Sequence, residues 1–126
     1  MEKIRILVIE PNQAPKVEEI EPKLEEYQRI VGGYIEAVYP WGDDEKYGNV
    51  ALICNEEGKY NGCVPNRSLG DYDVIFGTFI IAGLGEEDFC GLTQELIDHY
   101  EDMFRSPETF FRTPDGIVSV RTEPMR

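Results

Sequence analysis

The residues that could do chemistry are few in this chain, which has one histidine, three cysteines and three serines. No serine lies in the Gly-x-Ser-x-Gly pattern of a nucleophile elbow, and a cysteine nucleophile would need His99, on a separate expected helix, as its base. Zinc ligands occur as closely spaced groups of histidine and cysteine, which the sequence lacks. We therefore expect no catalytic residues, no metal site and no cofactor.

A second set of polar residues lies in the stretch NEEGKYNGCVPNRS, residues 55 to 68, where asparagines gather with a lysine and an arginine. One interpretation is a β-hairpin turn at residues 56–58, with Gly58 at positive φ. The turn leaves the other polar residues unexplained. In the alternative they bind a nucleotide-like ligand: glycines permit close approach, a ring stacks, asparagines read hydrogen-bonding edges and cations meet phosphates. The candidates are Gly32, Gly33, Tyr34, Asn55, Lys59, Asn66 and Arg67.

Acidic residues dominate the charge, with 25 Asp and Glu against 12 Lys and Arg and a formal net charge of -13. This charge disfavours nucleic acid and anionic membrane as partners, because both would repel it. Either the carboxylates only solvate the surface, or they dock on a basic protein face, with fast and salt-sensitive binding. The candidates for docking are Asp43, Asp44, Glu45, Glu86, Glu87, Asp88, Asp98, Glu101 and Asp102.

The length of 126 residues suits one domain with one hydrophobic core. The first residues, MEKIRILVIEP, alternate charged and apolar side chains and lack the apolar region of a signal peptide. No apolar run approaches the roughly 20 residues of a membrane span. We expect a cytoplasmic protein whose cysteines, Cys54, Cys63 and Cys90, are reduced and mostly buried.

The elements that position these residues begin with a strand at residues 3–11, in which Ile6 and Val8 point to one face and Leu7 and Ile9 to the other. Gly32 is expected to end the first helix in the left-handed conformation. In order, this half is expected to hold the first strand, a polar connection at 12–19, a helix at 22–31, a strand at 34–40, an acidic loop at 42–49, and a hairpin of strands at 50–55 and 59–64.

The second half holds the most apolar run, DVIFGTFIIAGL at residues 73–84, which predicts a central strand with Gly77 at a bulge or a close backbone approach. LTQELIDHYEDMF predicts a helix with Thr93 as its N-cap and Leu92 packed on Ile97. TFFRTPDGIVSV predicts a C-terminal hairpin around the turn TPDG, and its adjacent phenylalanines make it a candidate surface for homo-oligomer formation.

This order of elements favours the α+β class, with a mostly antiparallel sheet, two main helices packed on it and a C-terminal β-hairpin. We expect residues 1–106 to form a single domain and residues 107–126 a hairpin or tail extension.

Four segments in succession, VGGYIEAVYP, ALICNEEGKYNG, PNRSL and DVIFGTFIIAGLGEEDF, resemble the family known as domain of unknown function 3846, over roughly residues 3 to 104. This family is carried by bacteriophages, plasmids, conjugative elements and their bacterial hosts. The resemblance implies an accessory role on a mobile element, and it implies no particular reaction or ligand.

Two non-enzymatic hypotheses follow. In the first, the acidic surface binds a host protein with a basic face, such as a defence or nucleic-acid-processing factor. In the second, a polar pocket sequesters a nucleotide-type signal. A third interpretation is structural, with a solvated acidic face and asparagine-capped turns. We favour the first slightly, because the charge is read directly from the sequence while the pocket is inferred.

Overall fold

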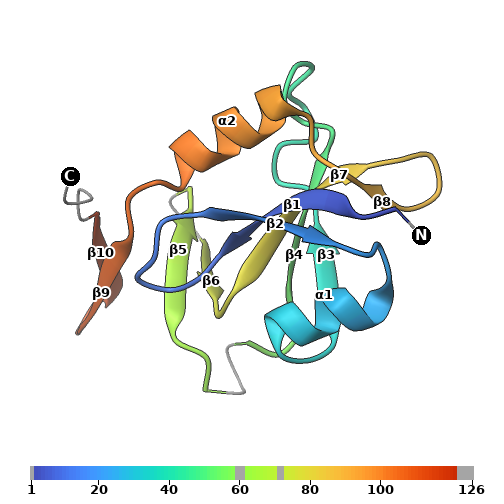
Figure 1. The fold of residues 1–126 in the computed structure, drawn as a ribbon. Coiled ribbons are helices and arrows are strands. Elements are labelled where there is room, and N and C mark those ends of the chain that lie inside the picture. The colour runs from blue at the N-terminus through green and yellow to red at the C-terminus, as the bar shows by residue number, and fades with distance from the viewer. Residues whose placement is uncertain (1, 59–61, 71–72, 122–126) are drawn as a thin grey trace.

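The computed structural model describes residues 2–58, 62–70 and 73–121. Its main sheet has the strand order β2-β1-β7-β4-β3, with β8 paired to β7, and every strand pair is antiparallel (Figure 1). The elements are β1 (Ile4–Ile9), β2 (Lys16–Ile20), α1 (Leu24–Val31), β3 (Ile35–Val38), β4 (Val50–Asn55), β5 (Pro65–Leu69), β6 (Asp73–Phe76), β7 (Phe79–Leu84), β8 (Phe89–Cys90), α2 (Gln94–Met103), β9 (Glu108–Thr113) and β10 (Gly116–Arg121).

Two hydrophobic clusters lie on the two faces of this sheet, because side chains alternate along each strand. In β1, Ile6 and Val8 belong to the cluster under α1, and Leu7 and Ile9 belong to the cluster under α2, as the alternation predicts. Figure 1 shows the two helices on opposite sides of the sheet. The α+β class, with a mostly antiparallel sheet and two helices, is therefore confirmed.

The end of α1 and the start of α2 lie at the capping residues predicted from the sequence. Gly32 closes α1 in the left-handed conformation, at φ 81. The Thr93 Oγ1 atom accepts a hydrogen bond of 3.2 Å from the backbone N–H of Leu96 at the start of α2. Leu92 and Ile97 are buried in the same hydrophobic cluster, in agreement with the expected contact.

The prediction of a polar connection at residues 12–19 is wrong, because Lys16–Ile20 form β2, and every residue of β2 pairs with β1. Only Ile20 of this strand is buried. An edge strand exposes one side to water and is often rich in charge, which prevents pairing with other chains. Its sequence KVEEI therefore lacks the apolar signal of an inner strand.

The single strand predicted at residues 73–84 is also wrong. Gly77, at φ 80, separates β6 from β7, and β6 pairs with β5 in a separate hairpin. The group that lies close to Gly77 is a side chain, since a Cβ placed there would lie 3.2 Å from the Cβ and Sγ atoms of Cys63. An apolar run shows that a segment is buried and does not show where a positive-φ glycine divides it.

The hairpin predicted between residues 50–55 and 59–64 does not form, because β4 pairs with β3 and β7 instead. Residues 59–61 lie outside the described residues. Gly58 does not have positive φ, whereas Gly62 does, at φ 74. The reason for glycine at position 58 is close packing: a Cβ would lie 2.9 Å from the backbone oxygen of Phe76.

The C-terminal hairpin predicted from TPDG is confirmed as β9 and β10. Its base is attached to β5, since Glu108 accepts hydrogen bonds from the backbone N–H and the hydroxyl of Ser68, at 2.7 and 2.5 Å. Phe111 and Val118, opposite each other in the register, are about half exposed. The division into a domain and a tail extension at residue 106 stays a prediction. No helix among the described residues is long and apolar enough to cross a membrane.

Candidate functional site

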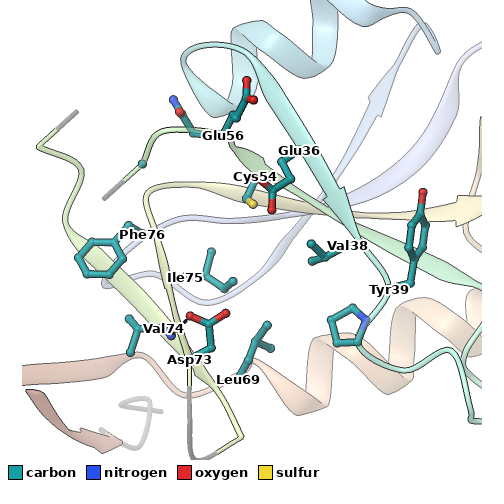
Figure 2. Close-up of a pocket in the computed structure, with 13 residues that line it drawn as sticks. Glu36, Val38, Tyr39, Cys54, Glu56, Leu69, Asp73, Val74, Ile75 and Phe76 are labelled. Carbon is teal, nitrogen blue, oxygen red and sulfur yellow. Dashed lines mark hydrogen bonds between the residues drawn. The ribbon is translucent and has the colours of Figure 1, made fainter. Parts of the chain in front are cut away.

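A groove of about 510 Å³ lies between the edge of the main sheet, at β3 and β4, and the hairpin of β5 and β6 (Figure 2). It opens on the sheet face that also packs against α2, because its residues Val38, Cys54, Leu69 and Ile75 belong to or adjoin that hydrophobic cluster. The full lining is Glu36, Val38, Tyr39, Pro40, Cys54, Asn55, Glu56, Gly58, Leu69, Asp73, Val74, Ile75 and Phe76.

Three carboxylates line the groove, those of Glu36, Glu56 and Asp73, and all three residues are exposed. No lysine, arginine or histidine is found among the described residues of the lining. The Asp73 carboxylate accepts a hydrogen bond of 2.8 Å from the backbone N–H of Val74, which fixes its position at the start of β6. The described lining of the groove therefore carries a net negative charge.

Cys54 lines the groove, and its surroundings raise the pKa of its thiol. Burial, with a smaller contribution from the nearby carboxylates of Glu36 and Asp73, raises the pKa of Cys54 to about 11. Figure 2 shows the Glu36 side chain beside this sulfur. A thiolate is the nucleophilic form, so at neutral pH Cys54 is a protonated thiol and a weak nucleophile. The two carboxylates, which add to the effect of burial on this thiol, also attract cations.

Apolar side chains complete the lining of the groove. Val38 from β3 and Ile75 from β6 face the groove from opposite sides in Figure 2, and Leu69 of β5 lies beside Asp73. Lysine and arginine side chains have an apolar stem and a charged end, and they place the stem on apolar surface while the charge meets a carboxylate. The arrangement can thus bind a cationic group with an apolar stem.

Three of the predicted ligand-binding residues, Gly33, Tyr34 and Asn55, come together, and of these Asn55 lines the groove. The Asn55 side chain is almost buried: its Nδ2 donates to the Val31 carbonyl at 3.2 Å, and its Oδ1 accepts from the Glu57 N–H at 2.8 Å. A Cβ at Gly33 would lie 2.9 Å from Asn55 Nδ2, so glycine leaves room for this amide. Tyr34 is 73% exposed. Asn55 thereby holds the end of α1 against β4.

Asn66 and Arg67 lie elsewhere, and neither lines the groove. Asn66 is completely buried, and its Nδ2 donates to the carbonyls of Ile9 and Gly77 at 2.8 and 2.9 Å. Arg67 is 1% exposed. Its guanidinium donates to the carbonyl of Phe104 at 2.9 Å, that of Gln13 at 2.6 Å and the Asn66 Oδ1 at 2.8 Å. Its donors are occupied by the protein itself.

The structure therefore does not bring the seven predicted ligand-binding residues into one pocket. Gly32 ends α1 and has open space beside it. Lys59 lies outside the described residues. Asparagine and arginine occur in this part of the sequence because strand ends and loops leave backbone carbonyls that need donors.

The predicted acidic surface divides into two regions. Asp44 accepts hydrogen bonds from the backbone N–H groups of Lys46 and Tyr47, at 2.9 and 2.8 Å, and these bonds lower its pKa. The Tyr47 ring stacks on His99 with centroids 3.8 Å apart, so the loop with Asp43, Asp44 and Glu45 lies beside α2, which carries Asp98, Glu101 and Asp102. Glu86, Glu87 and Asp88 form the separate turn between β7 and β8.

The carboxylates of the groove, which sequence reasoning missed, are distant in the chain and become neighbours only through the fold. The available signal was Glu36 in the segment IEAV, because its alternation places Glu36 on the same face as Val38. The three cysteines are partly buried and unbonded, which corrects the expectation of mostly buried thiols. Within the described part of the chain, no group of histidine, cysteine and acidic side chains could hold a metal ion.

Comparison with known proteins supports the resemblance seen in the sequence. Residues 4–105 match the family model described as domain of unknown function (DUF3846). No curated protein and no solved structure matches the chain. The family match includes β3, β4, β5 and β6, which form the groove, and ends before the hairpin of β9 and β10. Because this match spans most of its length, the chain belongs to the DUF3846 family.

Proposed function

We propose that this protein is a binding protein and not an enzyme, and that it acts by taking a basic segment of a partner protein into the groove between β3 and β6. The observation that carries the proposal is the combination of carboxylates and apolar side chains in one groove of about 510 Å³. The partner is a host protein with a basic surface, such as a defence or nucleic-acid-processing factor. The protein itself is an accessory protein of a phage or mobile element.

Charge favours this partner at two distances. The net charge of -13 attracts a basic protein from afar, which speeds association and makes it sensitive to salt. At close range, Glu36 and Glu56 have no ion-pair partner among the described residues, so a lysine or arginine of the partner displaces no ion pair that the described residues form with these two carboxylates. Long-range attraction thereby leads to a defined local contact.

A nucleotide-type ligand is less well supported by the same groove. Phosphates need cationic or N–H donors, and the described lining supplies carboxylates instead. Two cations, Lys59 and Arg67, are among the predicted ligand-binding residues. The structure describes Arg67, which donates to backbone carbonyls of the protein itself. The groove therefore favours the protein-binding hypothesis over sequestration of a nucleotide signal.

The test is binding of fluorescent heptapeptide pools with lysine or arginine fixed at the centre, measured by anisotropy at low and high salt. The double substitution Glu36→Gln with Glu56→Gln should weaken binding about tenfold, since each neutralised contact contributes up to roughly 1 kcal/mol. The matched control, Glu86→Gln with Glu87→Gln, removes the same charge from the β7–β8 turn and should change binding less than about twofold. Equal losses in both variants would contradict the proposal.

A further inference from the structure

The strand β3 lies at one edge of the main sheet and among the described strands pairs only with β4. The unpaired side of an edge strand presents backbone N–H and C=O groups that can pair with another chain. The groove begins at this strand, because Glu36, Val38, Tyr39 and Pro40 all line it. Backbone pairing and groove binding are therefore available at the same place.

The register identifies which backbone groups face outward. The Glu56 N–H donates to the Tyr34 carbonyl at 2.9 Å, so this opposite pair is hydrogen-bonded. In an antiparallel ladder, hydrogen-bonded pairs alternate with non-hydrogen-bonded pairs, so Glu36 and Val38 bond to β4 while Ile35 and Ala37 do not. The N–H and C=O groups of Ile35 and Ala37 therefore point to the free edge, where no described residue bonds to them.

The side chains of β3 alternate between the two faces of the sheet. Glu36 and Val38 line the groove, whereas Ile35 and Ala37 pack against the cluster under α1. A strand added at this edge would alternate likewise, so every second side chain would lie on the groove side beside Glu36 and Val38. Opposite charges in adjacent strands stabilise such pairing.

We propose that the segment bound in the groove is extended, pairs with the free edge of β3 through the backbone groups of Ile35 and Ala37, and places a lysine or arginine side chain beside Glu36. This inference rests on the proposed function and names its binding mode, which is β-strand addition. Main-chain pairing gives the affinity in this mode, and the groove selects the basic side chain.

The variant Ala37→Pro tests the backbone contact. Its N–H faces the free edge, so proline removes that donor and leaves the ladder with β4 intact, a position at which strands tolerate proline. Against the lysine- and arginine-centred heptapeptide pools, we expect Ala37→Pro to weaken binding about five- to tenfold, the effect of one hydrogen bond. Peptides N-methylated at alternate positions should lose binding with a period of two residues.

The outcomes separate this inference from the proposed function. Loss of binding in both Ala37→Pro and the Glu36→Gln, Glu56→Gln variant supports strand addition. A folded Ala37→Pro protein that binds within about twofold of the unmodified protein, while the charge variant loses about tenfold, overturns strand addition and leaves the groove as the site. If neither variant loses binding, the proposed function fails as well.

Amide hydrogen exchange of the unmodified protein decides the question if Ala37→Pro does not fold. Saturating peptide should slow exchange at the amides of Ile35 and Ala37 about tenfold or more, because these N–H groups become hydrogen-bonded. Unchanged exchange at both amides, with peptide bound, overturns the pairing.

Discussion

Replacing Arg67 by methionine tests whether this residue supports the fold or binds a ligand. The substitution keeps much of the apolar stem and removes every guanidinium donor. Arg67 joins three separate parts of the chain: β5, the loop after β1 through Gln13, and the end of α2 through Phe104. Without it, two buried acceptors lose their shortest hydrogen bonds, the Phe104 carbonyl and Asn66 Oδ1. A third, the Asn66 carbonyl, loses a longer bond of 3.2 Å, while Gln13 is exposed and can bind water.

The magnitude follows from these acceptors. Each buried acceptor left without a donor costs about 1 to 3 kcal/mol. Two of them give roughly 2 to 6 kcal/mol, and methionine recovers part of this because a buried guanidinium pays a desolvation cost. Burial indeed lowers the pKa of Arg67, in the direction that desolvation requires. We expect Arg67→Met to reduce the free energy of unfolding by about 3 kcal/mol.

Equilibrium unfolding in urea measures this change, followed by the fluorescence of Trp41, whose ring lies 4.7 Å from that of Tyr100 and 6.0 Å from that of Phe104. The matched control is Arg29→Met, which removes an exposed ion pair to Glu26 and should cost less than about 1 kcal/mol. A stability within about 1 kcal/mol of the unmodified protein for Arg67→Met would refute the structural role.

Three further results are expected. Tyr27→Phe should leave the free energy of unfolding unchanged or raise it by up to about 1 kcal/mol, because the buried Tyr27 hydroxyl has no partner among the described residues. Tyr100→Phe should lower it by about 1 to 2 kcal/mol, since the Tyr100 hydroxyl donates to the Tyr47 carbonyl at 2.5 Å. Urea unfolding that gives the reverse order of stability would contradict these hydrogen-bond assignments. Iodoacetamide should modify Cys54 with a pH midpoint near its pKa of about 11, and mass spectrometry that places the midpoint near the ordinary 9.0 would contradict the burial of this thiol beside Glu36 and Asp73. Gly77→Ala should destabilise the fold more than Gly32→Ala, because both glycines have positive φ and only at Gly77 would a Cβ meet a side chain at 3.2 Å; equal unfolding midpoints would contradict this.

Regular alternation and capping made much of the fold predictable from the sequence. The two faces of β1, the Gly32 end of α1 and the Thr93 start of α2 depend on neighbours within a few residues, so local sequence contains their signal. β2 was missed because an edge strand is mostly exposed and its sequence resembles a polar loop.

Tertiary placement made the candidate site harder to predict. Asn66 and Arg67 were correctly identified as unusual in an acidic chain, and their partners, backbone carbonyls on β1 and after α2, could not be inferred from sequence spacing. The groove was missed for a related reason. Glu36 and Asp73 lie on strands from opposite halves of the chain, and only the packing of the β5–β6 hairpin against β4 brings them together.

The most direct test of the central claim is a chemical-shift map of the isotope-labelled protein titrated with the lysine- and arginine-centred heptapeptide pools. We predict that the largest amide shifts lie in β3, at the end of β4 and in β6, the elements that line the groove. Shifts confined to the turn at residues 86–88 or to α2, or no shifts at saturating peptide, would contradict it.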